Sequence, residues 1–380
     1  MRTALVNGRV LTNGGIVEDR AVLLEGGRIA DVVSGKDPRC TQAERHDLDG
    51  DFLLPGFVDT QVNGGGGVLF SDDPSVEAVR EIGSAHRRFG TTGFLPTLIS
   101  ADLEVVAQAI ASVRQAIDAG VPGVLGIHIE GPFLNVARKG VHDPAKLREL
   151  DEEAIGLLTS HRGGTTLVTI APEMTTPEVI TRLSAAGLIV SAGHSNATCA
   201  EIRVALRHGL TGFTHLFNAM SQLTGREPGV VGAALEDPDS WCGIIVDGRH
   251  VDPTVLRIAL RCKRHDRFML VTDAMPSVGA AEKSFSLQGR RISIADGVLV
   301  DADGTLAGAD IDMASTVRNA VSLLGLTLED ATRMASQYPA EFLGLGAELG
   351  RIAAGYRANL VQLDDRLEVV TTWIEGRTPG

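Results

Sequence analysis

Short runs of consecutive apolar residues alternate, through the middle of the chain, with longer stretches in which apolar residues recur every three or four positions. The first pattern is typical of strands buried on both faces, and the second of amphipathic helices. We therefore expect strands at 54–59, 92–98, 125–130, 166–171, 188–194, 211–215, 242–247 and 269–273. Helices are expected between most of them, at 76–89, 102–118, 176–186, 198–208 and 253–264. This alternation predicts an α/β fold with a (β/α)8 barrel of the TIM type, and an open doubly wound sheet is the alternative.

The two ends of the chain have a different pattern, with short β-type runs and no helical period. Near the N-terminus these runs are separated by Asn-Gly and Gly-Gly pairs, which favour turns. Near the C-terminus two further runs flank an Asp-Asp pair. Because chain ends often lie close together in compact proteins, we expect residues 1–54 and 350–380 to form one small, discontinuous β-sandwich module. The catalytic barrel would then span residues 55–349.

The end of the barrel has two further features. Residues 284–300 alternate in the manner of β-strands and predict a β insertion after the eighth strand. Helices expected at 311–324 and 328–337 would then close the barrel.

Charge, cysteine spacing and hydrophobicity indicate which partners and which location to expect. The formal net charge of the 380 residues is −13, which argues against a nucleic-acid-binding surface but permits a small anionic substrate held by local cations. The four cysteines lie far apart and form no CxxC pair, so we expect reduced thiols. The N-terminus has no apolar stretch of signal-peptide length, and no segment approaches the length of a membrane span. We therefore expect a cytoplasmic protein with no membrane partner.

Four of the predicted strands deliver a polar, metal-capable or proton-transferring side chain at or near the C-terminal end. These side chains are Glu130, His194, His215 and Asp273. In a parallel barrel the C-terminal ends of the strands converge on one face, where active sites lie. Glu130, His194 and His215 form an oxygen, nitrogen, nitrogen set that suits a divalent ion such as zinc and leaves a position for water. Asp273 would take a proton from that water and pass it to a leaving group.

The motifs around these residues resemble the amidohydrolase superfamily and, within it, the N-acetylglucosamine-6-phosphate deacetylases. The resemblance covers nearly the whole chain. Its motifs span residues 54–59, 128–132, 139–142, 192–195, 214–220, 225–229, 247–250, 271–274 and 306–308. It implies hydrolysis of the acetamido group of N-acetyl-D-glucosamine 6-phosphate to D-glucosamine 6-phosphate and acetate, in amino-sugar metabolism. The alternatives are an N-acetylgalactosamine-6-phosphate deacetylase, another amidohydrolase, or a non-catalytic homologue. The last would tend to lose metal ligands, and here all four positions are filled.

The first barrel strand departs from the usual superfamily pattern. Where that pattern has His-x-His, this chain has Gln61 and Asn63, and neutral amides are poor ligands for zinc or iron. The fourth strand, at 166–171, also lacks a lysine that could bridge two metals. We therefore expect one divalent metal per subunit, zinc first, with iron, cobalt, manganese or cadmium as alternatives. The Gln-x-Asn variant occurs in part of the deacetylase family.

The resemblance also implies how a phosphorylated amino sugar is held. Arg226 and His250 are candidate phosphate contacts, with the backbone at Asn218 and Ala219, and Arg226 would reach the site of a neighbouring subunit in a homodimer. His142 would either polarise the amide carbonyl, as a catalytic residue, or orient a sugar hydroxyl. The remaining candidate substrate contacts are Gln61, Asn63, Val141, Leu306, Ala307 and Gly308, of which the last three would line the acetyl side.

Other histidines and cysteines receive structural interpretations. His128 shares the inward face of Glu130, and we expect it to be packed beside the site and not to be a ligand. Four histidines lie in or beside charged helical stretches and are expected at the surface: His86, His161, His208 and His265. Cys199 and Cys242 are expected to be buried.

Overall fold

The computed structural model describes residues 2–160, 163–295 and 297–379. Eight parallel strands form its central sheet, in the order β15-β14-β13-β12-β11-β10-β9-β6. Their bounds are β6 (Phe57–Val62), β9 (Thr91–Ile99), β10 (Gly126–Glu130), β11 (Thr165–Ile170), β12 (Ile189–Ala192), β13 (Leu210–Phe213), β14 (Trp241–Ile244) and β15 (Phe268–Leu270). The strand order follows the chain order around the sheet, as the alternation of strands and helices predicts. The TIM-type barrel is therefore confirmed.

The barrel nearly closes between β6 and β15. Val62, the last residue of β6, forms a parallel bridge with Ala274, which lies four residues past β15. The backbone N–H groups of Asn63 and Gly64 both donate to the Ala274 carbonyl, at 2.9 and 3.0 Å. These bonds hold the segment that carries Asn63 against the segment that carries Asp273.

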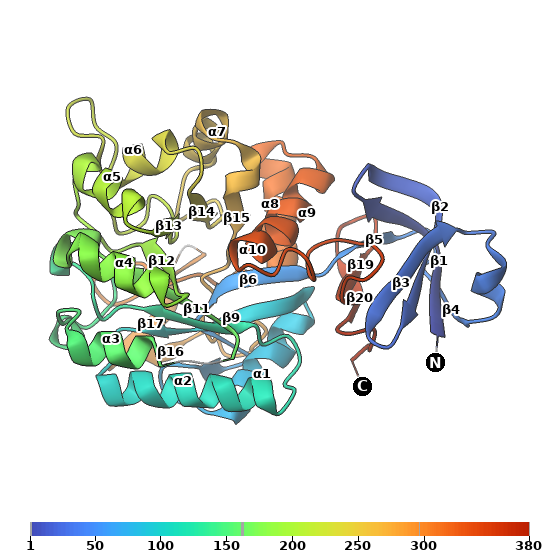
Figure 1. Ribbon diagram of the computed structural model, residues 1–380, viewed down its shortest axis with the longest axis horizontal. Coiled ribbons are helices and arrows are strands. Elements are labelled where there is room, and N and C mark those ends of the chain that lie inside the picture. Colours follow the sequence, from blue (N-terminus) through green and yellow to red (C-terminus); the bar gives the residue numbers. More distant parts are fainter. Residues whose placement is uncertain (1, 161–162, 296, 380) are drawn as a thin grey trace.

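Helices surround the barrel (Figure 1), and their bounds are α1 (Val76–Arg87), α2 (Leu103–Asp118), α3 (Glu152–Leu158), α4 (Pro177–Ala185), α5 (Cys199–Arg207), α6 (Gly229–Glu236), α7 (Pro253–Cys262), α8 (Met313–Leu324), α9 (Leu328–Ala335) and α10 (Gln337–Phe342). Several begin at a Ser, Thr or Asp whose side chain accepts from a backbone N–H of the first turn, as at Ser75, Thr198 and Asp312. Their apolar faces join the strands in one large buried core. Among the described residues, no helix is long and apolar enough to cross a membrane.

The helical pattern fails where a helix is not amphipathic or is very short. α6 was missed because it is apolar and buried along most of its length, so it has no polar face to reveal a period. α3 and α10 have only 7 and 6 residues, which is too short for a period to show.

Strands from both chain ends lie in a second, seven-stranded sheet, in the order β20-β19-β5-β1-β2-β3 with β4 also paired to β1. The bounds are β1 (Arg2–Thr12), β2 (Gly15–Glu25), β3 (Arg28–Ser34), β4 (Glu44–Asp47), β5 (Phe52–Pro55), β19 (Leu360–Leu363) and β20 (Val369–Trp373). Figure 1 shows the blue N-terminal strands beside the red C-terminal ones, at one end of the molecule. The expected pairing of the two ends is therefore present.

Two details of this sheet correct the expectations. The Asn7-Gly8 pair is not a turn, since β1 runs through it and the pairing with β2 shifts register on both sides of Gly8. Asn7 has a φ of +60° there, so the pair forms a β-bulge. The strand expected at 54–59 is two strands, because β5 pairs with β19 whereas β6 belongs to the barrel.

The insertion after β15 is a three-stranded antiparallel sheet, β16 (Phe285–Leu287), β17 (Arg290–Ala295) and β18 (Val298–Val300). Its apolar residues pack with Val141 and Met275, which belong to the loops at the mouth of the barrel. Gln288 also accepts from the Asp143 N–H at 2.6 Å and donates to the Ser100 carbonyl at 2.8 Å. The insertion therefore borders the mouth of the barrel. A small ribbon, β7 (Gly64–Gly65) and β8 (Val68–Leu69), follows β6.

Candidate active site

Three of the predicted residues meet at the mouth of the barrel. Glu130 is the last residue of β10, and His194 and His215 lie two residues past the ends of β12 and β13. The Glu130 Oε1 atom lies 3.2 Å from His194 Nε2 and 2.8 Å from His215 Nε2, and the two Nε2 atoms are 3.1 Å apart. All three side chains are buried. They form a three-residue cluster that can hold a metal ion.

The separations and proton positions of this cluster fit a divalent cation. Four-coordinate zinc with bonds of about 2.0 Å has neighbouring ligand atoms about 3.3 Å apart, close to the values here. His194 Nδ1 donates to the Arg138 carbonyl at 2.8 Å, which leaves the Nε2 lone pair free to bind a metal. Burial raises the pKa of Glu130, but its contacts with His194 and His215 outweigh burial and hold that pKa well below its ordinary value. The Glu130 carboxylate is therefore ionised.

The chain is strained where it presents these side chains. His194, His215 and Asp273 have φ values of +49°, +33° and +52°. Non-glycine residues rarely adopt this left-handed region, and such residues cluster at active sites. The strain arises just past the strand ends, where each backbone must turn its side chain over the barrel mouth.

Asp273 faces the cluster from the other side of the same mouth, three residues past β15. Its Oδ1 atom accepts from Asn63 Nδ2 at 2.6 Å and from Gln61 Nε2 at 3.1 Å, and Gln61 Nε2 also lies 3.2 Å from Glu130 Oε2. Burial, and after it the Glu130 charge, raise the pKa of Asp273 to about 6. The two amides of the first strand thus act as hydrogen-bond donors to carboxylates. Asn63 Oδ1 has no partner among the described residues, and Asn63 lines the cavity.

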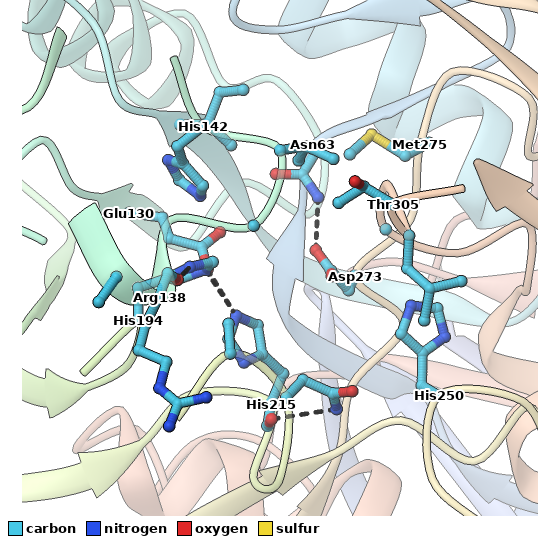
Figure 2. Close-up of a pocket in the computed structure, with 18 residues that line it drawn as sticks. Asn63, Glu130, Arg138, His142, His194, His215, His250, Asp273, Met275 and Thr305 are labelled. Atoms are coloured by element: carbon cyan, nitrogen blue, oxygen red, sulfur yellow. Dashed lines mark hydrogen bonds and ion pairs between the residues drawn. The ribbon is translucent and has the colours of Figure 1, made fainter. Parts of the chain in front are cut away.

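His142 has a defined tautomer. The backbone N–H of Ser100 points at His142 Nδ1 from 3.3 Å, and Ser100 Oγ lies 2.7 Å from the same atom. A backbone nitrogen only donates, so Nδ1 is the acceptor. Burial lowers the pKa of His142 to about 3, and the neutral ring therefore carries its proton on Nε2. Figure 2 shows His142 beside Glu130, on the same side of the cavity.

His250 is oriented by an acid of its own loop. Its Nδ1 atom lies 2.6 Å from Asp247 Oδ2, and Asp247 Oδ1 accepts from the backbone N–H groups of Arg249 and His250 at 2.9 Å. Burial tends to raise the pKa of Asp247, but these hydrogen bonds lower it overall. His250 thus presents its other ring nitrogen on the side of the cavity where Asp273 lies (Figure 2).

These side chains line one cavity of about 350 Å³, a volume within the range of small-molecule sites. The expected residues among its lining are Asn63, Glu130, Val141, His142, His194, His215, Asn218, Ala219, His250, Asp273, Leu306 and Gly308. Three expected residues are not in the lining. Gln61 lies beneath it, Ala307 is fully buried, and Arg226 is exposed on a loop elsewhere.

Sequence reasoning missed part of the lining, namely Ile99, Ala137, Arg138, Gly140, Met275 and Thr305. Arg138 is the one arginine or lysine among the described residues that line the cavity. Its position directly before the Lys139-Gly140-Val141-His142 motif was an available signal. No sequence signal identified Ile99 and Met275 as lining residues, because apolar residues there cannot be distinguished from core residues.

Most of the structural interpretations hold. His128 is not part of the cluster, since its two nitrogens lie 3.1 Å from Thr97 Oγ1 and 2.8 Å from Thr169 Oγ1. Cys199 and Cys242 are buried.

The expectation for His86 was wrong, because this side chain is fully buried and contacts the Gly64 carbonyl at 2.9 Å. His265 is exposed, His208 is partly exposed, and His161 lies outside the described residues.

Comparison with known proteins agrees with this geometry. Residues 52–378 match the model of the amidohydrolase family. The chain is 45% identical over 369 residues to an N-acetylgalactosamine-6-phosphate deacetylase of Shewanella sp. (strain ANA-3), covering 97% of this chain and 93% of that one. It is 38% identical to an N-acetylglucosamine-6-phosphate deacetylase of Haemophilus influenzae, covering 99% of both.

A solved structure extends the comparison. A mutant N-acetyl-D-glucosamine-6-phosphate deacetylase from Mycobacterium smegmatis, in complex with N-acetyl-D-glucosamine 6-phosphate, superposes with a TM-score of 0.91 at 34% identity, covering 100% of this chain and 98% of that chain. The chain belongs to the amidohydrolase family. The family and the Glu130, His194, His215 cluster together indicate an enzyme of the hydrolase class with a divalent metal site.

Proposed function

We propose that the chain hydrolyses the acetamido group of N-acetyl-D-glucosamine 6-phosphate and releases D-glucosamine 6-phosphate and acetate. The observation that carries this proposal is a single cavity in which a three-residue metal cluster faces a buried aspartate of raised pKa. Full-length relatives of the chain are deacetylases of phosphorylated amino sugars, and one such protein has been solved with this sugar phosphate.

A divalent cation at Glu130, His194 and His215, which we propose to be zinc, would supply Lewis acidity and lower the pKa of a nearby water. Asp273 takes a proton from the attacking water, whose oxygen bonds to the acetyl carbon. When the carbon–nitrogen bond breaks, Asp273 returns the proton to the departing amine. A carboxyl group with a pKa of about 6 is ionised at neutral pH and still basic enough for this exchange.

His142 supplies a donor for the charge that develops on the acetyl oxygen. Its Nε2–H is fixed by the contact of Nδ1 with Ser100, so no reorganisation is needed when the carbonyl becomes tetrahedral. Asn63 Oδ1 remains available to accept from the amide N–H of the substrate. Leu306 and Gly308 would flank the acetyl group.

The phosphate would contact groups from both sides of the cavity, because His250 adds a polar group from the side of Asp273 and Arg138 adds a cationic group from the side of His194 (Figure 2). Asn218 and Ala219 also line the cavity, although the Asn218 backbone N–H donates to the His215 carbonyl at 3.0 Å. Arg226 is exposed and outside the cavity of its own chain. We therefore propose a homodimer in which Arg226 reaches the cavity of the neighbouring subunit, and Arg226→Ala should then raise KM for the sugar phosphate.

A second candidate substrate is N-acetyl-D-galactosamine 6-phosphate. It is favoured by one observation, the 45% identity to an N-acetylgalactosamine-6-phosphate deacetylase. The two sugars differ in the orientation of a single hydroxyl, and a missing partner for one hydroxyl is enough to separate them kinetically.

The test is acetate release from three compounds: N-acetylglucosamine 6-phosphate, its galacto epimer, and unphosphorylated N-acetylglucosamine. The proposal expects the highest kcat/KM for the first and a large loss without phosphate. A higher kcat/KM for the epimer would establish the second candidate. No release from either phosphorylated sugar by zinc-loaded protein would overturn the proposal.

The domain organisation is also proposed. Residues 1–54 and 350–380 would form a small β-sandwich module beside a catalytic barrel of residues 55–349. In its support, both faces of the sheet formed by the chain ends carry buried apolar clusters. We propose a cytoplasmic location, in keeping with four cysteines that are all free.

A further inference from the structure

One carboxylate connects the loop that follows Glu130 with the loop that carries His194, although it lies outside the cavity lining. Glu173 follows β11, within the short turn Pro172–Met174. Its Oε1 atom accepts from Asn135 Nδ2 at 2.9 Å and from the Asn196 backbone N–H at 2.6 Å, and Oε2 accepts from Ser195 Oγ at 2.7 Å. Asn135 lies in the loop after β10, and Ser195 and Asn196 lie in the loop after β12.

These two loops also hold each other, around His194. The Asn135 N–H donates to the His194 carbonyl at 3.0 Å, and His194 Nδ1 donates to the Arg138 carbonyl at 2.8 Å. Arg138 Nε donates to Asn196 Oδ1 at 2.9 Å. Backbone and ring of His194 are thus both bonded to the loop after β10, and Glu173 braces that loop on one side and the residues after His194 on the other.

The backbone conformation of His194 requires these contacts. Its φ of +49° is unfavourable for a non-glycine residue, and it persists only where the surroundings over-determine the backbone. A loop that relaxed from this conformation would turn the imidazole away from Glu130. It would also break the bond from Nδ1 to the Arg138 carbonyl, which keeps the Nε2 lone pair free.

We propose that Glu173 is a positioning residue that sets the metal affinity of the site through His194. Glu173 contacts neither a ligand atom nor the cavity, and it acts by fixing the loops after β10 and β12 in one register. The inference rests on the proposed metal site. If Glu173 only stabilised the fold, its replacement would lower thermal stability and leave metal affinity unaltered. Metal affinity therefore distinguishes a positioning role from a purely structural one.

The test measures zinc affinity by competition with a chromogenic chelator for the wild-type chain, Glu173→Ala and Glu173→Gln. Glu173→Ala removes all three acceptor contacts, and it should weaken zinc binding about 10- to 100-fold. Glu173→Gln should recover most of the affinity, because its carbonyl still accepts from Asn135 and Asn196. The absorption spectrum of the cobalt-loaded protein should change in the alanine variant and not in the glutamine variant.

Asp237→Ala is the matched control. Asp237 is also a carboxylate that accepts loop hydrogen bonds, here from the backbone N–H groups of Asp239 and Ser240 to Oδ1, but it precedes β14 at the opposite end of the barrel. Its removal should leave zinc affinity unchanged. Equal zinc affinity in Glu173→Ala and wild type, or equal weakening in Asp237→Ala, would overturn the inference. A wild-type chain that binds no zinc would instead overturn the proposed metal site, and this inference with it.

Discussion

The two sides of the cavity are built from the same kind of element, and each holds one carboxylate, but different groups surround the two carboxylates. On one side Glu130, His194 and His215 converge on a point, and the His194 ring donates to the Arg138 carbonyl. On the other side Asp273 is surrounded by neutral donors, the amides of Gln61 and Asn63. The first arrangement concentrates lone pairs, which suits a cation. The second stabilises one carboxylate that can exchange a proton.

The difference depends on the residues at the end of β6, where Gln61 and Asn63 stand in place of two histidines. Imidazoles at positions 61 and 63 would offer lone pairs and extend the metal cluster toward Asp273. The amides found there use their N–H groups to hold Asp273 Oδ1. These bonds hold Asp273 in place, as the base role proposed for it requires.

Replacing the acid on the proton side should have the largest effect. Asp273→Asn keeps the shape and removes the base, so kcat should fall by about 10²- to 10⁴-fold while bound zinc stays near one per chain. Steady-state acetate release and metal analysis on the same sample measure both. A kcat within a few-fold of wild type would remove Asp273 from the mechanism.

The next largest effect should come from the donor on the metal side. His142→Phe removes the Nε2–H and should lower kcat by about 10²-fold with little change in zinc affinity. Separate determination of kcat and KM decides between the two roles considered for His142. A rise in KM with kcat unchanged would show that the ring orients a sugar hydroxyl.

A smaller change tests the amide contacts to Asp273. Asn63 donates to the ionised carboxylate and lowers its pKa, so Asn63→Leu should raise that pKa by about one unit. The base must be ionised, and activity is lost as the pH falls through its pKa. The acid limb of the kcat/KM profile should therefore move to higher pH, and an unmoved limb would contradict the assigned contact.

The last prediction concerns folding stability and not catalysis, at Asp59 beneath Asp273. Burial raises the pKa of Asp59 to about 7, against an ordinary value of 3.8, although Thr272 and Gln61 donate to it. The folded chain then binds more protons than the unfolded chain between about pH 4 and 7, so Asp59 should contribute a fall in unfolding free energy as the pH rises through this window. The fall is at most about 4 kcal/mol.

Asp59→Asn removes this titration, and thermal melts at pH 5 and pH 8 measure the result. The variant should lose less stability than wild type between the two pH values. An equal loss in both proteins would show that Asp59 keeps an ordinary pKa in the folded chain.

The sequence predicted the barrel and the four polar strand ends, because buried strands and amphipathic helices have distinct periods and because active-site residues lie at strand ends. It did not predict α6, which has no polar face. It also did not predict Arg138 or Glu173, whose roles come from contacts between loops that are distant in sequence. Such contacts produce no recognisable pattern in the local sequence. The Asn7-Gly8 pair shows the same limit, since a dipeptide typical of turns forms a bulge when neighbouring strands continue the pairing.

The division of the cavity into a metal side and a proton side is tested most directly by anomalous X-ray diffraction from crystals of the zinc-loaded protein. The account predicts one anomalous peak per chain, bounded by Glu130 Oε1, His194 Nε2 and His215 Nε2. A second peak of similar height at Gln61 and Asn63 would contradict it, as would a peak bounded by any other residues.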